Sequence, residues 1–233
     1  MSGQSLFERL REACAEPWEA YVRHPFVQGL GAGTLPESCF RHYLIQDYLF
    51  LIHFARAYGL AAYKAETLAD VRAAAAGLSA IVDQEIGLHI AYCASWGISE
   101  AQIAVAEEAE ATMAYTRYVL EAGSAGDLLD LQVALAPCIV GYAEIGRALA
   151  ADPATACDVN PYRSWIEMYG GDDYQTVATG HIAQMDALFA RRGGPGRMPR
   201  LVGHFARATR LERAFWDMGM AAPGATPRAD SAF

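Results

Sequence analysis

The sequence predicts an all-α protein, a single-domain bundle of about eight helices. Three observations support this prediction. The alternating apolar pattern of a β-strand is nearly absent, apolar residues recur at helical spacing along most of the chain, and alanine, a strong helix former, is abundant. The 233 residues are 53% hydrophobic, which is enough for the core of one large domain. No sequence period of about 20–50 residues indicates a solenoid.

Proline, glycine and capping residues separate the predicted helices. These helices cover approximately 5–23, 36–63, 67–96, 99–122, 124–150, 162–169, 172–189 and 199–219. His24-Pro25 ends the first helix, and the glycine-rich segment 28–36 is expected to be a loop. Pro36 stands in the first turn of the second helix, where a missing amide hydrogen leaves no helical bond unmade.

The later helices begin and end at residues of the same kinds. Gly97 ends the third helix, and Ser99 begins the fourth as a capping box with Gln102. Two X-Pro pairs frame a loop over 152–161 after the fifth helix. Gly170-Gly171 then separates the short sixth helix from the seventh.

Two segments outside the helices have an unusual composition. The segment 190–200 is basic and also contains glycine and proline, so we interpret it first as a connecting loop and only second as an anion site. The segment 221–233 consists of small residues, proline and a few charges, and it is expected to be a disordered tail. The prediction is therefore one helical domain over 1–220, followed by that tail.

The charge and hydropathy of the chain argue against two classes of partner. A net charge of -9 disfavours nucleic acid, because phosphate binding needs a basic surface. The longest uncharged runs, such as 131–143, have about 13 residues, short of the roughly 18 expected of a membrane helix. The N-terminus has no apolar signal region. We therefore expect a cytoplasmic protein with neither nucleic acid nor a membrane as partner.

The cysteines and histidines do not form a recognisable metal-binding pattern. The cysteines are odd in number, widely spaced and without a C-x-x-C pair, which disfavours disulfides and zinc; they are Cys14, Cys39, Cys93, Cys138 and Cys157. Glu85 and His89 stand one helical turn apart and could form half of a metal site. A hydrogen bond between the two along the helix face is the favoured interpretation.

The second predicted helix carries a carboxylate inside an apolar stretch. Residues 44–63 are apolar nearly all the way round, which places this helix centrally, and Asp47 lies within them. A buried carboxylate costs several kcal/mol unless it is paired or hydrogen-bonded. Asp47 is either a structural residue bonded to a neighbouring helix or, the interpretation we favour, a ligand-binding group. Phe50 shares its face.

The fifth predicted helix is interrupted by a proline. Pro137 removes one backbone hydrogen bond and frees a carbonyl near Val133, so a kink is expected. Cys138 follows at once, and Tyr142 lies one turn later on the same face. A lone core cysteine is usually inert, and this is the favoured interpretation from composition and periodicity. The kink and the tyrosine favour a thiol that lines a cavity.

One acid and several tyrosines complete the candidate residues. Glu212 adjoins the apolar face of the eighth helix and could equally be exposed. Tyrosines on different helices could be core residues with satisfied hydroxyls or could surround a flat, polar heteroaromatic ligand. They are Tyr115, Tyr142, Tyr162 and Tyr169.

Several motifs in this order and spacing resemble the TenA family, also called thiaminase II or aminopyrimidine aminohydrolase. The resemblance extends from about Trp18 to Gly219. The motifs are HPFVQGLGAGTLP at 24–36, QDY at 46–48, AYTRY at 114–118, APC…Y..E.G through 136–146, W..MYGGD at 165–172 and LE..FW at 211–216. The resemblance implies the haem-oxygenase-like helical bundle.

The resemblance also implies a role for individual residues. The family's nucleophilic cysteine corresponds to Cys138, its acid/base glutamate to Glu212, and the carboxylate that binds the aminopyrimidine to Asp47. The remaining implied substrate-binding residues are aromatic: Phe50, Tyr115, Tyr142, Tyr162 and Tyr169. No metal and no organic cofactor is implied.

One position departs from the pattern of some members. These members have a tyrosine three residues after the aspartate of QDY, with its hydroxyl near the cysteine, whereas this chain has Phe50. A phenylalanine can stack on a pyrimidine but cannot hydrogen-bond a thiol. Another residue must therefore assist Cys138, and Tyr142 is the best candidate from the sequence. Cys138 itself places the chain with the cysteine-containing branch rather than the branch that uses a glutamate pair.

The implied activity is hydrolysis of 4-amino-5-aminomethyl-2-methylpyrimidine to the hydroxymethylpyrimidine and ammonia, with thiamin as a slower substrate. The alternatives are a non-catalytic protein that binds pyrimidine or thiamin, a regulator, and a haem protein that uses His24, His53 or His89. The resemblance further implies a homotetramer, for which apolar residues on the first and fourth predicted helices would suit an interface.

Overall fold

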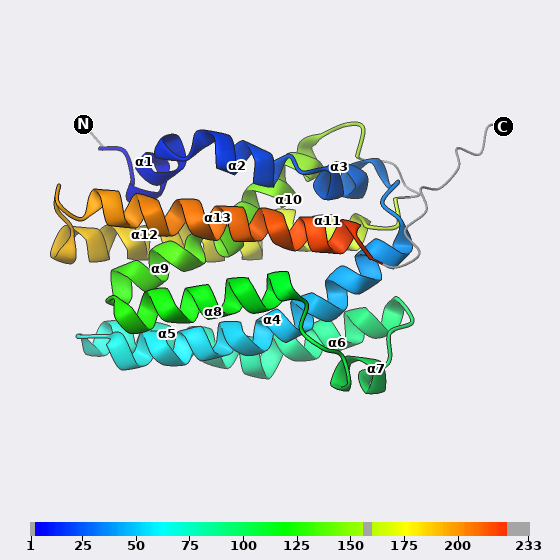
Figure 1. The fold of residues 1–233 in the computed structure, drawn as a ribbon, viewed down its shortest axis with the longest axis horizontal. Helices are drawn as coiled ribbons and strands as arrows, with labels where there is room; N and C mark the ends of the chain where they lie inside the picture. The colour runs from blue at the N-terminus through cyan, green and yellow to red at the C-terminus, as the bar shows by residue number, and fades with distance from the viewer. Residues whose placement is uncertain (1–2, 156–159, 223–233) are drawn as a thin grey trace.

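The computed structural model describes residues 3–155 and 160–222, which form helices joined by short connections (Figure 1). No strand occurs among these residues. The helices are α1 (Leu6–Ala13), α2 (Ala15–Val22), α3 (Pro25–Ala32), α4 (Glu37–Lys64), α5 (Leu68–Ala80), α6 (Ile86–Ser95), α7 (Glu100–Ala104), α8 (Glu110–Ala125), α9 (Leu128–Ala136), α10 (Tyr142–Ala151), α11 (Arg163–Gly170), α12 (Asp172–Arg192) and α13 (Met198–Met220).

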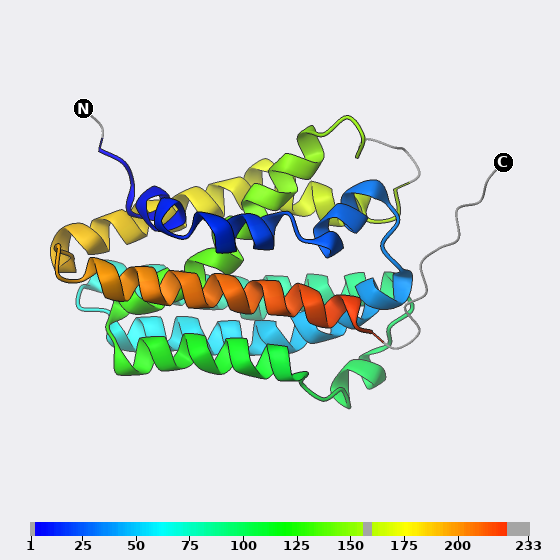
Figure 2. The same cartoon turned by 45° about the horizontal axis from the view of Figure 1, so that its top comes forward.

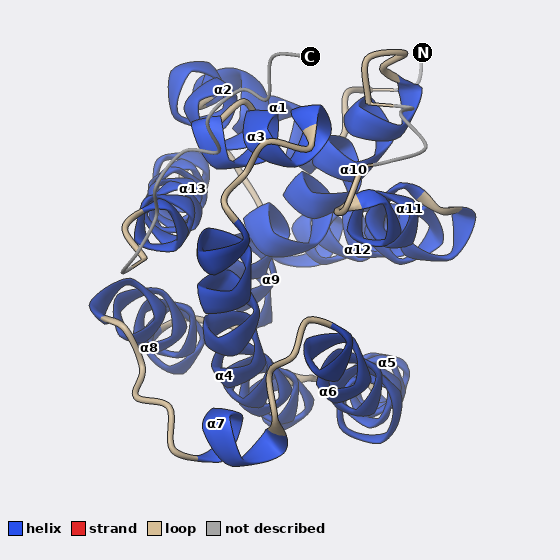
Figure 3. Ribbon diagram, turned by 90° about the vertical axis from the view of Figure 1, so that its right-hand side faces the viewer, coloured by secondary structure: helices blue, strands red, loops and turns tan. Residues whose placement is uncertain are grey.

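The helices surround a central pair, α4 and α9. Viewed along the bundle, α8 and α13 flank this pair on one side, while α5 and α6 and the group α10–α12 lie on the other (Figure 3). Helices α1–α3 run across one face over α13 (Figure 2). The long α4 carries apolar side chains over most of its circumference, which is the pattern that a central helix requires.

The all-α prediction is confirmed, although the chain divides into more helices than the eight expected. The first predicted helix is interrupted at Cys14, which separates α1 from α2. The fourth is interrupted over 105–109, so its capping box at Ser99 begins only the short α7. The break over 105–109 coincides with no proline or glycine, whereas the break at Cys14 lies just before Pro17, in the first turn of α2.

The prediction of a loop over 28–36 is wrong for most of its length, because α3 extends to Ala32. The His24 ring nitrogen accepts a hydrogen bond from the Phe26 amide, Pro25 begins the helix, and Gly33 ends it with a φ of 68°. Its glycines permit close packing: a Cβ on Gly31 would lie 2.8 Å from a side-chain atom of Leu149. The glycines thus serve tight packing here rather than a turn.

Two π-helical turns lie within otherwise continuous helices. The first π-turn, Ile81–Glu85, joins α5 to α6, and the second π-turn, Pro137–Gly141, joins α9 to α10. The expected disturbance at Pro137 therefore takes the form of a π-turn, a feature that is frequent at functional sites. The Tyr21 hydroxyl donates a hydrogen bond to the Pro137 carbonyl over 3.2 Å and supports the turn.

The helix that contains the second π-turn crosses the centre of the bundle. The stretch Leu128–Ala151 is long and apolar enough to span a membrane by length and composition, and 94% of its apolar window is buried inside the protein. A core helix of a bundle has these same properties. Its burial brings Cys138 and Tyr142 to the interior.

The basic segment 190–200 lies where α12 ends and α13 begins. Arg197 forms ion pairs with Asp127 over 2.6 Å and with the buried Asp130 over 2.9 Å, and Arg192 also pairs with Asp127. These arginines fasten the connection to the start of α9, which agrees with a connecting segment and contradicts an anion site. Of the predicted tail, residues 223–233 lie outside the described part of the chain, as does Cys157.

Candidate active site

A pocket with about 430 Å³ of empty space lies between α4, α8, α13 and the two π-turns. We call it the inner pocket. Side chains from eight elements line it: Asp47, Phe50, Leu51, Phe54, Glu85, Tyr115, Cys138, Tyr142, Tyr169, Tyr174, Glu212 and Phe215. Carboxyl, thiol and phenol groups thus converge from distant parts of the chain on one aromatic cavity.

The structure brings seven of the eight predicted site residues together in this pocket. They are Asp47, Phe50, Tyr115, Cys138, Tyr142, Tyr169 and Glu212. Tyr162 does not line it, so its assignment to the substrate site is wrong. Its ring stacks on Trp96 with centroids 5.5 Å apart, and its hydroxyl donates to the Leu35 carbonyl. Tyr162 is a core residue that holds the start of α11 against α4.

Cys138 lies in the second π-turn with only 7% of its surface exposed. Its sulfur is 3.0 Å from the Leu135 carbonyl, which accepts a hydrogen bond from the thiol. Burial raises the pKa of this thiol well above its usual value, the charge of Glu212 raises it further, and a hydrogen bond with Tyr115 opposes the rise. At neutral pH the group is a thiol, and it needs a base before it can act as a nucleophile.

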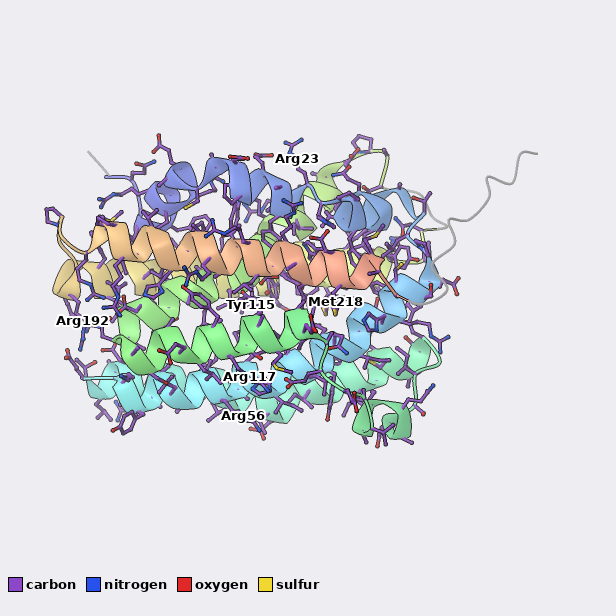
Figure 4. All side chains as sticks on the ribbon, viewed as in Figure 1. Arg23, Arg56, Tyr115, Arg117, Arg192 and Met218 are labelled. Atoms are coloured by element: carbon purple, nitrogen blue, oxygen red, sulfur yellow. The ribbon has the colours of Figure 1, made fainter. Side chains whose placement is uncertain are left out.

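Glu212 and Tyr115 supply a proton path that leads away from this thiol. The Tyr115 hydroxyl projects from α8 towards α13 (Figure 4) and donates to Oε1 of Glu212 over 2.8 Å. Only 1% of Glu212 is exposed, and burial raises its pKa to about 8 although the Tyr115 hydrogen bond lowers it. A carboxyl with this pKa can both donate and accept a proton near neutral pH. Tyr115, rather than Tyr142, provides the hydroxyl next to the thiol.

Asp47 presents a second carboxyl to the pocket from the middle of α4. It is 8% exposed, and its Oδ2 lies 3.7 Å from Nδ1 of His89. Nε2 of His89 donates to the Leu44 carbonyl over 2.8 Å, which orients the ring. Burial raises the pKa of Asp47, while the charge of His89 and a hydrogen bond from Tyr43 lower it. The predicted bond between Glu85 and His89 is absent, because His89 bonds to α4 instead.

Aromatic rings form the remaining walls. The Phe50 ring is tilted against that of Tyr115 with centroids 5.3 Å apart and meets Phe215 at 6.1 Å. The Tyr142 ring packs edge-on against Tyr169 at 4.9 Å. A flat ring could enter between these side chains and stack on them.

Of the five lining residues that the sequence did not indicate, two carry polar groups. Glu85 projects from the first π-turn, and burial raises its pKa to about 7, with the charge of Asp47 adding to the effect. The Tyr174 hydroxyl, on α12, lies 3.5 Å from the Cys138 carbonyl, to which it donates. Tyr174 follows the YGGD motif by only two residues, and this proximity was the available signal.

The three histidines considered as haem ligands are all engaged by protein groups. His24 pairs with Asp217 over 3.0 Å, and His53 pairs with Glu108 over 2.8 Å. His89 bonds to α4 as described, and none of the three lines the inner pocket. Among the described residues no cluster of three His, Cys, Asp or Glu side chains could hold a metal ion.

The chain is similar to known proteins both in sequence and in structure. Residues 11–222 match the TENA/THI-4/PQQC family. An aminopyrimidine aminohydrolase of Halalkalibacterium halodurans is 38% identical over 92% of this chain and 93% of its own.

Two solved structures extend the comparison. One from Silicibacter, described as a TenA family transcription regulator, is 46% identical with a TM-score of 0.85 and covers 92% of this chain and 96% of its own. A Shewanella denitrificans protein described as having a heme oxygenase-like fold is 14% identical with a TM-score of 0.72 over 97% of this chain and 98% of its own, which shows the fold alone. The predicted haem-oxygenase-like bundle is confirmed, and the chain belongs to the TENA/THI-4/PQQC family.

Proposed function

We propose that the protein is an aminopyrimidine aminohydrolase of thiamin salvage that uses Cys138 for covalent catalysis. Its substrate would be 4-amino-5-aminomethyl-2-methylpyrimidine, with thiamin as a slower second substrate. The observation that carries the proposal is the chain Cys138–Tyr115–Glu212, which faces Asp47 across an aromatic pocket. Membership of the family and the name of the Halalkalibacterium relative support the same reaction class.

The side chains that line the inner pocket would determine how the substrate binds. Asp47 would accept hydrogen bonds from the amino-bearing edge of the pyrimidine, and its bond to Tyr43 and the nearby His89 hold it in place. Phe50 would stack on the ring, and Tyr142 and Tyr169 would enclose it. This orientation leaves Glu212 to meet a ring nitrogen.

Addition of sulfur to the ring requires two coordinated proton transfers. Glu212 would give its proton to the ring nitrogen and then receive the thiol proton of Cys138 through the Tyr115 hydroxyl. The sulfur bonds to the ring carbon beside the methylene-bearing position, and the adduct, whose side chain carries an ammonium group, expels neutral ammonia to leave an exocyclic methylene. Water adds to that methylene and one of its protons ends on the ammonia; the sulfur–carbon bond then breaks, and the ring and thiol protons return along the same path.

Replacement of Cys138 tests the proposal directly. We expect the purified protein to release ammonia from the aminomethylpyrimidine and Cys138→Ser to lose at least about 10³-fold of that rate, since it lacks the nucleophile. Cys14→Ser is a matched control, because Cys14 is buried outside the pocket and its thiol faces the Val202 carbonyl. No turnover by the wild type, or full activity of Cys138→Ser, would refute the assignment.

A regulator on the same scaffold is the second candidate, because of the description of the Silicibacter neighbour. The net charge of -9 disfavours DNA as its target. Tight pyrimidine binding without ammonia release, together with retardation of a DNA duplex at low salt, would favour the regulator. We propose a cytoplasmic homotetramer for the enzyme.

A further inference from the structure

A second hollow adjoins the inner pocket and opens towards the surface. It encloses about 1190 Å³ including open solvent, and apolar side chains such as Tyr58, Ile81, Leu88 and Ile139 dominate its lining. We call it the vestibule. The side chains shared by the two cavities are Asp47, Phe54, Glu85, Tyr169 and Tyr174. These five therefore form the neck through which a leaving group must pass.

The reactive groups on the far side of the neck belong to the inner pocket alone. Cys138, Tyr115 and Glu212 do not line the vestibule. A pyrimidine held against these three thus has its other end at the neck. The vestibule, with its greater size, is the space into which the departing group can move.

Glu85 is the carboxyl at the neck that has no partner among the side chains the structure describes. Asp47 has Tyr43 and His89, and Glu212 has Tyr115. No hydrogen bond or ion pair to the Glu85 carboxyl occurs among the described residues. The titratable groups that face Glu85 are Asp47 and Tyr58 from α4, the Cys138 thiol from the second π-turn, Tyr169 from α11 and Tyr174 from α12. An unpaired carboxyl in a partly buried neck is free to bind a cation or to take up a proton.

The first π-turn explains how Glu85 reaches this position. A regular α-helix advances about 100° per residue, and the wider π-turn shifts the residues beyond it relative to those before it. Glu85 is the last residue of that turn. Its carboxyl consequently lies at the neck while Asp83, two residues earlier, is exposed and bonds to Ser79.

We propose that Glu85 binds the departing amine and then acts as the general base for water addition. This inference rests on the proposed hydrolase function. The carboxylate pairs with the substrate ammonium, and the carbon–nitrogen bond of the Cys138 adduct breaks to release neutral ammonia. The ring then carries the positive charge and an exocyclic carbon–carbon double bond.

Water occupies the place that the ammonia leaves. Its oxygen bonds to the methylene, the electrons of the exocyclic double bond return to the ring, and a proton of the water passes to the Glu85 carboxylate. Glu85 then gives that proton to ammonia, which departs as ammonium. All atoms and charges balance, and no other reactant is needed.

Single-turnover kinetics of Glu85→Gln test this role. The amide can accept a hydrogen bond from the ammonium but cannot take up the water proton. We expect one equivalent of ammonia per site in a rapid burst, steady-state turnover lower by about 10²-fold, and a pyrimidine methylene adduct on Cys138 in the intact-protein mass spectrum. Asp83→Asn, on the same turn, should behave like the wild type.

Three outcomes would overturn the inference. The first is wild-type steady-state turnover by Glu85→Gln, and the second is a folded Glu85→Gln without burst or adduct, which would place Glu85 before carbon–nitrogen cleavage. The third outcome concerns Glu85→Ala. Added formate should replace the carboxylate that this variant lacks, so failure of formate to restore turnover would contradict a general base. If the wild type itself does not release ammonia, the proposed function fails instead.

Discussion

At the scale of single residues, the hydroxyl of Tyr115 is the group that this chain offers in place of the hydroxyl missing at Phe50. It donates to Glu212 over 2.8 Å and lies near enough to Cys138 to lower the pKa of its thiol. The two functions of Glu212, donating to the ring and accepting from the thiol, both depend on this link. Although Phe50 has no hydroxyl, the Tyr115 hydroxyl can therefore still transfer the proton of the Cys138 thiol.

Removing the Tyr115 hydroxyl should separate its role from that of Tyr142. We expect Tyr115→Phe to lower kcat by about 10²-fold with little change in KM, because proton transfer from the thiol is lost while the ring that packs on Phe50 remains. Tyr142→Phe should cost less than about 10-fold. Equal losses in the two variants, measured by ammonia release, would contradict the assignment of the relay to Tyr115.

The buried carboxyl of Glu212 should make both activity and stability depend on pH. Its pKa is raised from 4.5 to about 8, so activity that needs the neutral acid should fall as the pH passes through about 8. Between pH 4.5 and 8 the folded state holds a proton that the unfolded chain has lost, so the stabilisation present below pH 4.5 disappears as the pH rises through this window.

A glutamine at the same position removes this titration. Glu212→Gln should abolish turnover yet raise the free energy of unfolding relative to wild type at pH 8.5, by on the order of 4 kcal/mol, with a much smaller difference at pH 5. Urea denaturation at the two pH values measures this. An equal difference at both would show that Glu212 does not titrate in the folded protein.

The site was predictable where a residue's role follows from its own chemistry and motif. Asp47 and Pro137-Cys138 stand out in apolar helices, and the motif resemblance adds Glu212. Tyr162 was assigned to the site because it precedes the MYGGD motif in the sequence, but this position does not indicate where its side chain points. Its hydroxyl donates to the Leu35 carbonyl in the core. Glu85 was missed because a π-turn has no local sequence signature. The 3.6-residue period, which predicts the face of a helix on which a residue lies, does not hold across such a turn.

At the scale of elements, the contact between α10 and α11 controls the position of a pocket residue. A Cβ on Gly146 would lie 2.5 Å from the Tyr169 carbonyl carbon and 2.6 Å from the Gly170 nitrogen. These are backbone atoms, so a side chain here must push the helices apart. Tyr169, at the neck between the two cavities, would move with α11.

Gly146→Ala should therefore affect both stability and substrate binding. We expect a loss of about 1–3 kcal/mol in the free energy of unfolding, because overpacking forces backbone shifts, and an increased KM. Gly180→Ala is the control: nothing lies within 4 Å of its Cβ, and the change should be neutral or stabilising by up to about 1 kcal/mol. A Gly146→Ala protein as stable as the control would refute this contact.

Element boundaries were predicted best where strong signals mark them. The box at Ser99 and the glycines at 170–171 lie at helix ends in the structure. The interruption at Cys14 was marked by Pro17, which stands in the first turn of α2, whereas no proline or glycine marks the interruption over 105–109. The segment 28–36 shows the opposite error, because most of it belongs to α3, where Gly31 packs against Leu149 of α10 and only Gly33 forms a turn.

At the scale of the whole molecule, exposed apolar side chains indicate where the subunits of an oligomer would meet. Large apolar side chains that remain exposed in the described chain are Tyr63, Leu68, Val82, Leu88, Val105, Met113, Met168 and Val177. The first predicted helix contributes none of them, and the fourth contributes Val105 and Met113. Of the two predicted helices named for the interface, the first and the fourth, the fourth alone offers exposed large apolar side chains.

We expect the purified protein to form a homotetramer in size-exclusion chromatography with light scattering. Met113→Glu combined with Val105→Glu should produce a smaller species, because both substitutions place charge on an exposed apolar stretch. A monomeric wild type, or an unchanged tetramer in the double variant, would contradict this assignment of the interface.

The two π-turns make the site sensitive to chain length. Each adds the equivalent of one residue to a helix that is otherwise regular. Deleting a single residue from either turn would convert it into a regular α-helix, so the residues beyond it would keep their direction. The side chains of the turn itself, Glu85 in one and Cys138 in the other, would be displaced. A one-codon deletion within a turn should thus abolish activity while much of the packing beyond it is retained.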